Sequence, residues 1–198
     1  MREQPVLEGE HVRLEPLAER HIAALRECAN DPALWDFTFA PNPFTSDMDA
    51  HSWLRQAVDA PHEWPFAIFD KQTGAVAGST RYLDMTPAHR KLEIGWTFIA
   101  QRFWRTPVNT EAKYLMLRYA FEEWNAVRVQ LKAEAVNSRS REAILRLGAA
   151  HEGTLRNFRI RPGESRPRDV AFYAITAQEW PAVKERLLTF LGRNLYSP

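Results

Sequence analysis

A basic loop directly before a helix is the first segment whose residue types could do chemistry. Residues 109–124 have the apolar spacing of a helix, so their first-turn N–H groups, around Val108 to Glu111, would point outward with the positive end of the helix dipole. Arg102 and Arg105 precede this turn, and arginine binds phosphate oxygens in a forked geometry. The segment therefore predicts an anion site, most naturally for phosphate. The alternative is that Thr106-Pro107 caps a core helix and the arginines are solvated.

Several other kinds of site are excluded. The eight glycines are scattered and form neither Gly-x-Gly-x-x-Gly nor Gly-x-x-x-x-Gly-Lys-Ser/Thr, and the chain contains neither Gly-x-Ser-x-Gly nor His-Glu-x-x-His. The six histidines lack ligand-like spacing and Cys28 is the single cysteine, so we expect no metal site and no disulfide framework.

Composition limits the class of protein. The 198 residues fit one domain, and a net charge of +1 gives no support to general nucleic-acid binding. The sequence has neither a membrane-length apolar run nor a signal peptide, so we expect a cytoplasmic protein. Charge is nevertheless uneven, with a net of −6 over residues 1–60 and +6 over 126–168. This pattern would suit a cationic ligand at one end and an anionic ligand at the other, unless it is unpatterned solvated surface.

Hydrophobic periodicity predicts an alternating order of strands and helices. Strands are expected at 12–17, 64–70, 75–85, 91–99, 127–134, 152–160 and 169–175, and helices at 18–29, 47–59, 109–124, 138–147 and 177–191. In the strand at 91–99, strict alternation would place Leu92, Ile94, Trp96 and Phe98 on one face and Glu93, Gly95 and Thr97 on the other.

Two segments in this order resemble a known family. Glu93-Ile94-Gly95-Trp96 precedes the basic loop and Asn109-Thr110-Glu111-Ala112 follows it, while Asn137-Ser-Arg-Ser leads to Leu147-Gly and then Glu152-Gly-Thr-Leu-Arg. Together they resemble the GNAT N-acetyltransferase superfamily, in its branch of ribosomal-protein N-terminal (alanine/serine) acetyltransferases. The resemblance implies a single mixed α/β domain over 1–198, with a central, largely antiparallel seven-stranded sheet flanked by helices. Residues 1–60 would form the acceptor side, 91–158 the coenzyme-binding core, and 177–192 the C-terminal helix.

The resemblance further implies that acetyl-CoA is the cosubstrate. The residues expected to hold it are Trp96, Thr97, Arg102, Arg105, Val108, Asn109, Thr110, Glu111 and Asn137. The chain departs from the family pattern in the pyrophosphate loop, where Trp104, Pro107 and Asn109 occupy the usual Arg/Gln and glycine positions. Pro107 lacks an N–H, so one phosphate donor is lost. For Asn137, the alternative is an ordinary helix cap.

Two residues are expected to be catalytic. Glu93 would accept the proton of the amine, and Ser140 would protonate the thiolate, because the tyrosine used by many family members is replaced by Ile144. Backbone N–H groups around Gly95-Trp96, where the glycine indicates a bulge, would polarise the thioester carbonyl. The alternatives are that Glu93 is a surface glutamate and that Ser140 is a capping residue.

The acceptor amine is expected near the aromatic segment that follows the first helix. Trp35, Phe37 and Phe39 would contact it, unless these rings plug the end of the sheet. The leading hypothesis is acetyl transfer to a protein N-terminal amine by direct attack in a ternary complex. Acetylation of a small amine, such as a polyamine or an antibiotic, a non-catalytic acyl-CoA-binding module and an interaction protein remain open alternatives, and so does a homodimer.

Overall fold

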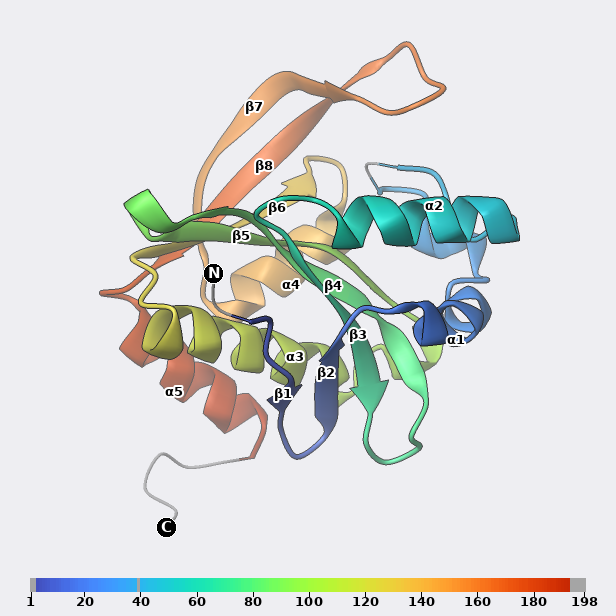
Figure 1. Ribbon diagram of the computed structural model, residues 1–198. Helices are drawn as coiled ribbons and strands as arrows, with labels where there is room; N and C mark the ends of the chain where they lie inside the picture. The colour runs from blue at the N-terminus through green and yellow to red at the C-terminus, as the bar shows by residue number, and fades with distance from the viewer. Residues whose placement is uncertain (1–2, 39, 193–198) are drawn as a thin grey trace.

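One twisted eight-stranded sheet forms the centre of the structure, a computed structural model that describes residues 3–38 and 40–192 (Figure 1). The strand order is β1-β2-β3-β4-β5-β6-β8-β7, and every neighbouring pair is antiparallel except β5 and β6. The strands are β1 (Leu7–Glu8), β2 (Val12–Pro16), β3 (Trp64–Asp70), β4 (Val76–Thr86), β5 (Lys91–Ile99), β6 (Arg128–Glu134), β7 (Ala150–Ile160) and β8 (Pro167–Thr176).

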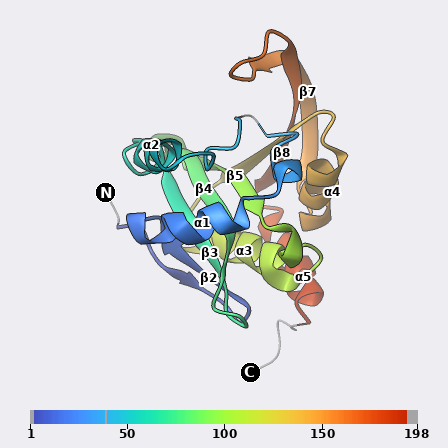
Figure 2. The ribbon, with the colours of Figure 1, turned by 90° about the vertical axis from the view of Figure 1, so that its right-hand side faces the viewer.

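Helices cover both faces of the sheet (Figures 1 and 2). We call one side the α2 face, which carries α1 (Ile22–Cys28) and α2 (Asp47–Val58). The other side, the α3 face, carries α3 (Pro107–Arg118), α4 (Ser138–Leu147) and α5 (Trp180–Phe190). Short 3-10 turns occur at Glu19–His21, Pro32–Leu34, Pro87–His89 and Gln101–Phe103, and a π-helical turn at Tyr119–Glu123 follows α3.

The predicted mixed α/β architecture is confirmed, but the predicted strand number was one too low. The additional strand, β1, has only two residues, which is too short for an alternation pattern to reveal it. The other departures lie at the ends of strands and helices. The third helix begins at Pro107 rather than at 109, because Thr106 caps it and proline is well accommodated at the first helical position.

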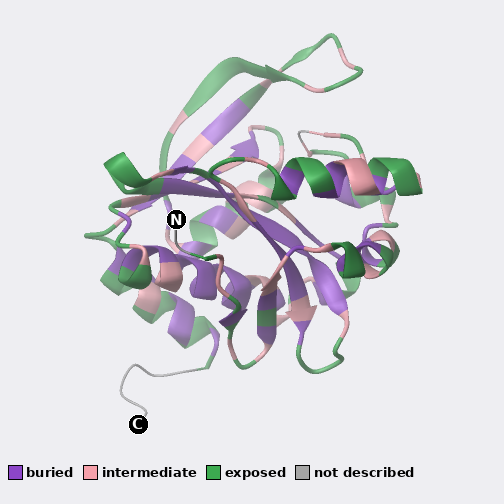
Figure 3. Ribbon diagram, in the orientation of Figure 1, coloured by how far each residue is buried: buried purple, intermediate pink, exposed green. Residues whose placement is uncertain are grey.

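The core lies between the sheet and the helices on both faces, as the buried ribbon segments in Figure 3 show. Helix α3 lies between the sheet and α5, and residues 108 and 110–117 are all buried, including Glu111 and Lys113. A helix that is enclosed on nearly all sides can present backbone and side chains to a ligand only at its end. At the N-terminal end of α3, Pro107 is exposed and Asn109 is half-buried, so a ligand could reach the helix there.

Strands β5 and β6 diverge soon after they pair. Their parallel pairing comprises Lys91 with Arg128, Leu92 with Val129 and Glu93 with Gln130, although β5 continues to Ile99 and β6 to Glu134. Beyond Glu93, the two strands are no longer paired with each other. The divergence begins at the residue that the sequence identified as a candidate base.

A carboxylate on α3 holds the N-terminal end of the sheet. Glu111 is completely buried and accepts hydrogen bonds from the backbone N–H groups of Glu10 (3.0 Å), His11 (2.6 Å) and Val12 (2.7 Å) in the β1–β2 turn. Gly9 makes this approach possible, because a Cβ atom there would lie 2.5 Å from the Glu111 carboxyl carbon. The β1–β2 turn is thus bound to a helix about 100 residues later in the chain.

We expect Glu111→Gln to lower the free energy of unfolding by about 2–4 kcal/mol, because the amide turns an N–H₂ group toward backbone N–H donors and leaves buried groups unsatisfied. Urea denaturation followed by circular dichroism measures this change. The control is Glu142→Gln, an exposed glutamate on α4, for which we expect a change within about 0.5 kcal/mol. Equal stability of the two variants would contradict the role of Glu111 in holding the β1–β2 turn.

Candidate functional site

Glu93 lies at the point where β5 and β6 separate, and its side chain is almost fully buried. One carboxylate oxygen, Oε2, accepts a hydrogen bond from Gln130 Nε2 at 3.0 Å and lies 2.8 Å from Lys132 Nζ. Burial raises the pKa of Glu93, while the ammonium of Lys132 opposes this shift. A buried carboxyl group with a raised pKa is a stronger base than an exposed glutamate, so the environment suits proton transfer. The surface-glutamate alternative does not describe this side chain.

A β-bulge follows Glu93. Ser79 pairs with Phe98 and Arg81 pairs with Gly95, so Thr80 on β4 lies opposite two residues of β5, Trp96 and Thr97. Trp96 has a φ of 48°, a left-handed conformation that is uncommon for a bulky side chain. The sequence predicted a bulge here from Gly95, but the left-handed residue is the tryptophan that follows.

The bulge changes which side chains share a face. Beyond it, Thr97 hydrogen-bonds to α3, whereas Phe98 packs against Trp35, Phe44 and Trp53 on the α2 face. The Trp96 ring also lies on the α2 face, against Arg81. The predicted strict alternation was therefore wrong for Trp96, Thr97 and Phe98, because one extra residue reverses the alternation. Gly95 keeps space beside the carboxylate, since a Cβ atom there would lie 3.1 Å from Glu93 Oε1 and 2.7 Å from Leu83 Cδ1.

An arginine that sequence reasoning did not select lies next to the bulge. Arg81 is nearly fully buried, and its guanidinium carbon lies 5.0 Å from the Trp53 ring centroid and 4.9 Å from that of Trp96. Its Nη1 lies 3.2 Å from Glu63 Oε2, while its buried Nε has no hydrogen-bond partner among the described residues. The cation therefore holds the Trp96 ring over the α2 face of β4.

A buried lysine lies beneath the bulge on the opposite face. Lys113 Nζ donates hydrogen bonds to Thr97 Oγ1 at 2.6 Å and to Thr80 Oγ1 at 3.1 Å, and the two hydroxyl oxygens are 2.8 Å apart. Burial lowers the pKa of Lys113 to about 7. The predicted coenzyme residue Thr97 is thus bound to α3 through its side chain.

The N-terminus of α3 differs in part from the predicted anion site. Thr106 is the N-cap, and its hydroxyl accepts the N–H of Val108 at 3.3 Å and donates to the carbonyl of Phe103 at 2.7 Å. Because Pro107 has no N–H and that of Val108 is capped, two first-turn donors are lost to an outside ligand. Asn109, the half-buried third residue of the helix, belongs to the same turn.

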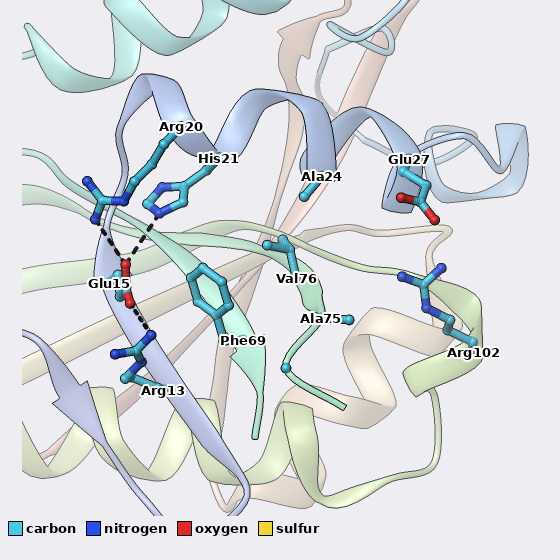
Figure 4. A pocket seen from close by; sticks show the side chains of 11 residues that line it. Arg13, Glu15, Arg20, His21, Ala24, Glu27, Phe69, Ala75, Val76 and Arg102 are labelled. Carbon is cyan, nitrogen blue, oxygen red and sulfur yellow. Dashed lines mark hydrogen bonds and ion pairs between the residues drawn. The ribbon is translucent and has the colours of Figure 1, made fainter. Parts of the chain in front are cut away.

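The two arginines before α3 lie in different surroundings. Figure 4 shows the Arg102 guanidinium pointing toward Glu27 of α1. Both residues line a cavity of about 490 Å³, together with Arg13, Glu15, Arg20 and His21. Arg105 is exposed, has a φ of 62° and directly precedes the N-cap of α3. The predicted pair is therefore divided, and Arg105 is the better placed residue for an anion at the helix end.

Thr110 and Glu111 have side chains that serve the fold. Thr110 is buried and its hydroxyl accepts a hydrogen bond from Arg146 of α4 at 3.0 Å, while Glu111 binds the β1–β2 turn. Because both side chains are engaged within the protein, only the backbone atoms of Thr110 and Glu111 could bind the coenzyme, as the sequence predicted for these residues.

The second segment of the resemblance adjoins the first. Asn137 is the N-cap of α4, and its Oδ1 accepts the N–H of Ser140 at 3.0 Å. The capping role, which was the alternative to a coenzyme contact, is therefore observed for this side chain. The guanidinium carbon of Arg139 lies 4.0 Å from the Trp104 ring centroid. The fold thereby brings the start of α4 beside the loop that precedes α3. Ser140 is half-buried in the first turn of α4, on the α3 face.

The predicted acceptor aromatics have unequal exposure. Trp35 is buried against Phe98 and donates its Nε1 hydrogen to the carbonyl of Ala29 at 3.0 Å, as expected for a ring that plugs the end of the sheet. Phe37 is 42% exposed and can meet a ligand. Phe39 lies outside the described residues.

The acidic and basic stretches of the sequence lie partly beside each other in the fold, while the approach of a cationic acceptor over residues 1–60 stays a prediction. The β7–β8 hairpin carries five basic residues of the segment 126–168 and extends on the α2 face, where Arg161 donates to the carbonyl of Trp35 at 3.0 Å (Figure 1). Two acidic residues of the N-terminal part are already engaged, since Asp47 pairs with Arg26 and Asp31 caps the turn at Pro32–Leu34. Folding therefore mixes charges that are separated in the sequence.

Sequence reasoning missed the residues that support Glu93 and Thr97. Gln130 and Lys132 alternate along β6 on one face, which could have signalled partners for a buried carboxylate. Ser79, Thr80 and Arg81 form a polar run within the buried part of β4. Lys113 lies off the apolar stripe of α3, and no local signal predicts its burial, which depends on the packing of β4 and β5.

Within residues 3–38 and 40–192, no group of three or more His, Cys, Asp and Glu side chains is placed to hold a metal ion. None of the described helices is both long and apolar enough to span a membrane.

Comparisons with known proteins identify this architecture. Residues 11–150 match the acetyltransferase (GNAT) domain family. Over 184 residues the chain is 29% identical to the "Putative ribosomal N-acetyltransferase YdaF" of Bacillus subtilis (strain 168), covering 89% of this chain and 97% of that protein. It is 26% identical over 194 residues to the "FsC-acetyl coenzyme A-N(2)-transacetylase" of Aspergillus fumigatus, covering 94% and 82%.

A solved structure agrees over nearly the whole chain. The crystal structure of a "putative acetyltransferase" from T. thermophilus has 39% identity and a TM-score of 0.88, covering 96% of this chain and 100% of that one. The resemblance found in the two sequence segments is thus confirmed by a family match over most of the chain. The chain belongs to the GNAT acetyltransferase family, and its activity is that of an acetyl-CoA-dependent N-acetyltransferase.

Proposed function

We propose that this N-acetyltransferase acetylates a protein N-terminal α-amine, with Glu93 as the general base. The observation that carries the proposal is the buried carboxylate of Glu93 at the divergence of β5 and β6, beside the bulge. The similarity to YdaF, which is named as a "putative ribosomal N-acetyltransferase", supports a protein acceptor.

The required proton transfer fits an α-amine. An α-amino group has a pKa of about 7.7–8.0, whereas that of a lysine amine is about 10.4, so less driving force is needed to deprotonate the former. Glu93 takes a proton from the amine directly or through one water, and the neutral nitrogen attacks the thioester carbon. The C–S bond breaks as the amide C–N bond forms, and the thiolate leaves with the electron pair of the broken bond. The nitrogen, positively charged after its attack, loses its second proton to the thiolate, with the Ser140 hydroxyl as the relay.

Other groups assist at the two ends of the thioester. Backbone N–H groups at the Gly95-Trp96 bulge stabilise the developing negative charge on the carbonyl oxygen. Ser140, in the first turn of α4, donates a proton to the thiolate, while Asn137 at the same helix end and the backbone of β5 beyond Glu93 bind the pantetheine amides. The unpaired edge of β5 supports this placement, since its N–H and C=O groups are not used by β6.

A small amine is the second candidate acceptor. The relative from Aspergillus fumigatus is named as an FsC transacetylase rather than as an enzyme that acts on proteins, and this chain covers 82% of it. The exposed Phe37 and the loop around it would then contact the small molecule.

A panel of amines distinguishes the two acceptors. With acetyl-CoA present, we expect release of free thiol with a peptide that has a free N-terminus, and none with the same peptide after N-terminal blocking, even when it contains lysine. Mass spectrometry locates the acetyl group. A polyamine reacting faster than every peptide would overturn the protein-acceptor proposal.

The pH profile of turnover tests Glu93. Because burial raises the pKa of Glu93 and the base must be ionised, the acid limb of kcat should lie above the range of an ordinary glutamate. Glu93→Gln should reduce kcat by about 100-fold or more and flatten this limb, while the affinity for acetyl-CoA is unchanged.

The matched control for Glu93 is Glu152→Gln, which removes a partly exposed carboxylate paired with Arg128 near the same strands. This variant should keep both the rate and the acid limb. If Glu93→Gln also kept them, the base would be another group.

The two arginines provide a test of coenzyme binding. Arg105→Gln should weaken acetyl-CoA binding about three- to tenfold and reduce its salt dependence, because an exposed arginine–phosphate contact is partly screened. Arg102→Gln should change the affinity less than about twofold, because this guanidinium faces Glu27 and not the helix end. A charge that acts on the phosphates only from a distance is largely screened by salt. Isothermal titration at low and high salt measures both. If Arg102→Gln weakened binding more than Arg105→Gln, the phosphates would instead lie on the α1 side of the loop.

A further inference from the structure

The hydrogen-bonded group of Lys113, Thr80 and Thr97 has no part in the chemistry described above, yet it occupies the bulge. We call it the bulge triad. It joins three elements: Thr80 from β4, Thr97 from β5 and Lys113 from α3. Its oxygen and nitrogen atoms are separated by 2.6–3.1 Å, so each member contacts the other two.

The location of the triad is specific. Thr80 is the single β4 residue opposite Trp96 and Thr97, and the pairs next to it are regular, from Gly78 to Ser79 on one side and from Arg81 to Leu83 on the other. A bulge leaves its extra residue outside the ladder of backbone hydrogen bonds, so its geometry must be held by other contacts. On the α2 face Arg81 holds the Trp96 ring, and on the α3 face Lys113 holds Thr97. The bulge is thereby fixed from both sides of the sheet.

Stability alone does not account for the lysine. Lys113 is 6% exposed and, among the described residues, forms no ion pair with a carboxylate. Burying an amine without a counter-charge is unfavourable, and an apolar side chain of similar length would avoid the desolvation penalty. The lowered pKa of about 7 reflects this penalty. A residue that opposes stability at a position next to the site is typical of a functional constraint.

We propose that Lys113 is a positioning residue for acetyl transfer: through Thr97 and Thr80 it fixes the β5 bulge in register with α3. The inference rests on the proposed role of the Gly95-Trp96 N–H groups in binding the carbonyl oxygen. Lys113 is seven residues beyond the N-cap Thr106, so it links the helix end that meets the phosphates with the bulge that meets the thioester. One rigid helix then sets the distance between the phosphates and the thioester of the coenzyme.

The test compares stability with turnover. Lys113→Met should leave the melting temperature unchanged or raise it, because the desolvation penalty disappears, yet lower kcat by about 10- to 100-fold, as expected for a small misplacement of catalytic groups. The KM for the amine should change less than about threefold, since the acceptor binds on the opposite face. Lys184→Met, which removes a partly exposed lysine on α5 paired with Glu122, is the control and should change neither quantity.

The threonines provide a rescue experiment. Thr97→Val has nearly the same shape but lacks the hydroxyl and should lose kcat like Lys113→Met, whereas Thr97→Ser keeps the hydroxyl and should retain most of the rate. Hydrogen exchange of the Trp96 and Thr97 amides should be faster in Lys113→Met and Thr97→Val than in the wild type.

The outcomes separate this inference from the proposed function. If the wild type transfers acetyl groups and Lys113→Met retains full kcat, the inference is wrong and the proposed function stands. If Lys113→Met and Thr97→Val lose stability and rate in parallel, the triad is only a packing contact and the inference is also wrong. If the wild type releases no thiol with any amine, the proposed function fails. The role of Lys113 in fixing the bulge is then tested by hydrogen exchange alone, and unchanged exchange of the Trp96 and Thr97 amides in Lys113→Met would show that this role is wrong.

Discussion

The end of pairing between β5 and β6 is the constraint on which the other parts of the site depend. Two parallel strands that paired along their full length would use all their facing N–H and C=O groups on each other. Here pairing ends after Glu93 and Gln130, and the bulge at Trp96 follows within three residues. The interruption places a carboxylate, a glycine and unused backbone groups together in a few residues of one strand. The helices that follow β5 and β6 begin beside each other, as the contact of Arg139 with Trp104 shows.

The two buried carboxylates Glu111 and Glu93 have different roles, and the hydrogen-bond partners of each one indicate its role. Glu111 is surrounded by three backbone N–H groups and acts as a fixed structural acceptor. Glu93 has side-chain partners on one oxygen, and its other oxygen lies over a glycine. The first arrangement satisfies a carboxylate permanently, whereas the second leaves part of it accessible for proton transfer. Two glutamates of the same strand–loop–helix unit therefore have different chemistry because of their surroundings.

Much of the fold could be predicted from local pattern, because most strands and helices here have clear alternation or helical spacing. The helix 138–147 has both its cap Asn137 and its terminal Gly148, and its predicted bounds match those observed. The faces of β5 could not be predicted in full, since one left-handed residue reverses the alternation and nothing in the side chain of Trp96 indicates that conformation. The burial of Lys113 and the position of the β7–β8 hairpin arise from contacts between distant segments, which periodicity does not report. The motif residues were thus found from sequence, whereas their supporting partners required the structure.

The contact of Glu111 with the β1–β2 turn also has a consequence for synthesis on the ribosome. The turn at Glu10 to Val12 leaves the ribosome about 100 residues before the carboxylate that satisfies its N–H groups. At roughly 5–20 residues per second, this interval lasts on the order of 5–20 s. Strands β3 and β4 can pair during that time, but the turn must wait for α3 with its backbone groups solvated. Residues 10–12 therefore reach their final contacts only after α3, about 100 residues later, has been made, and the nascent chain remains open at this edge until the helix emerges.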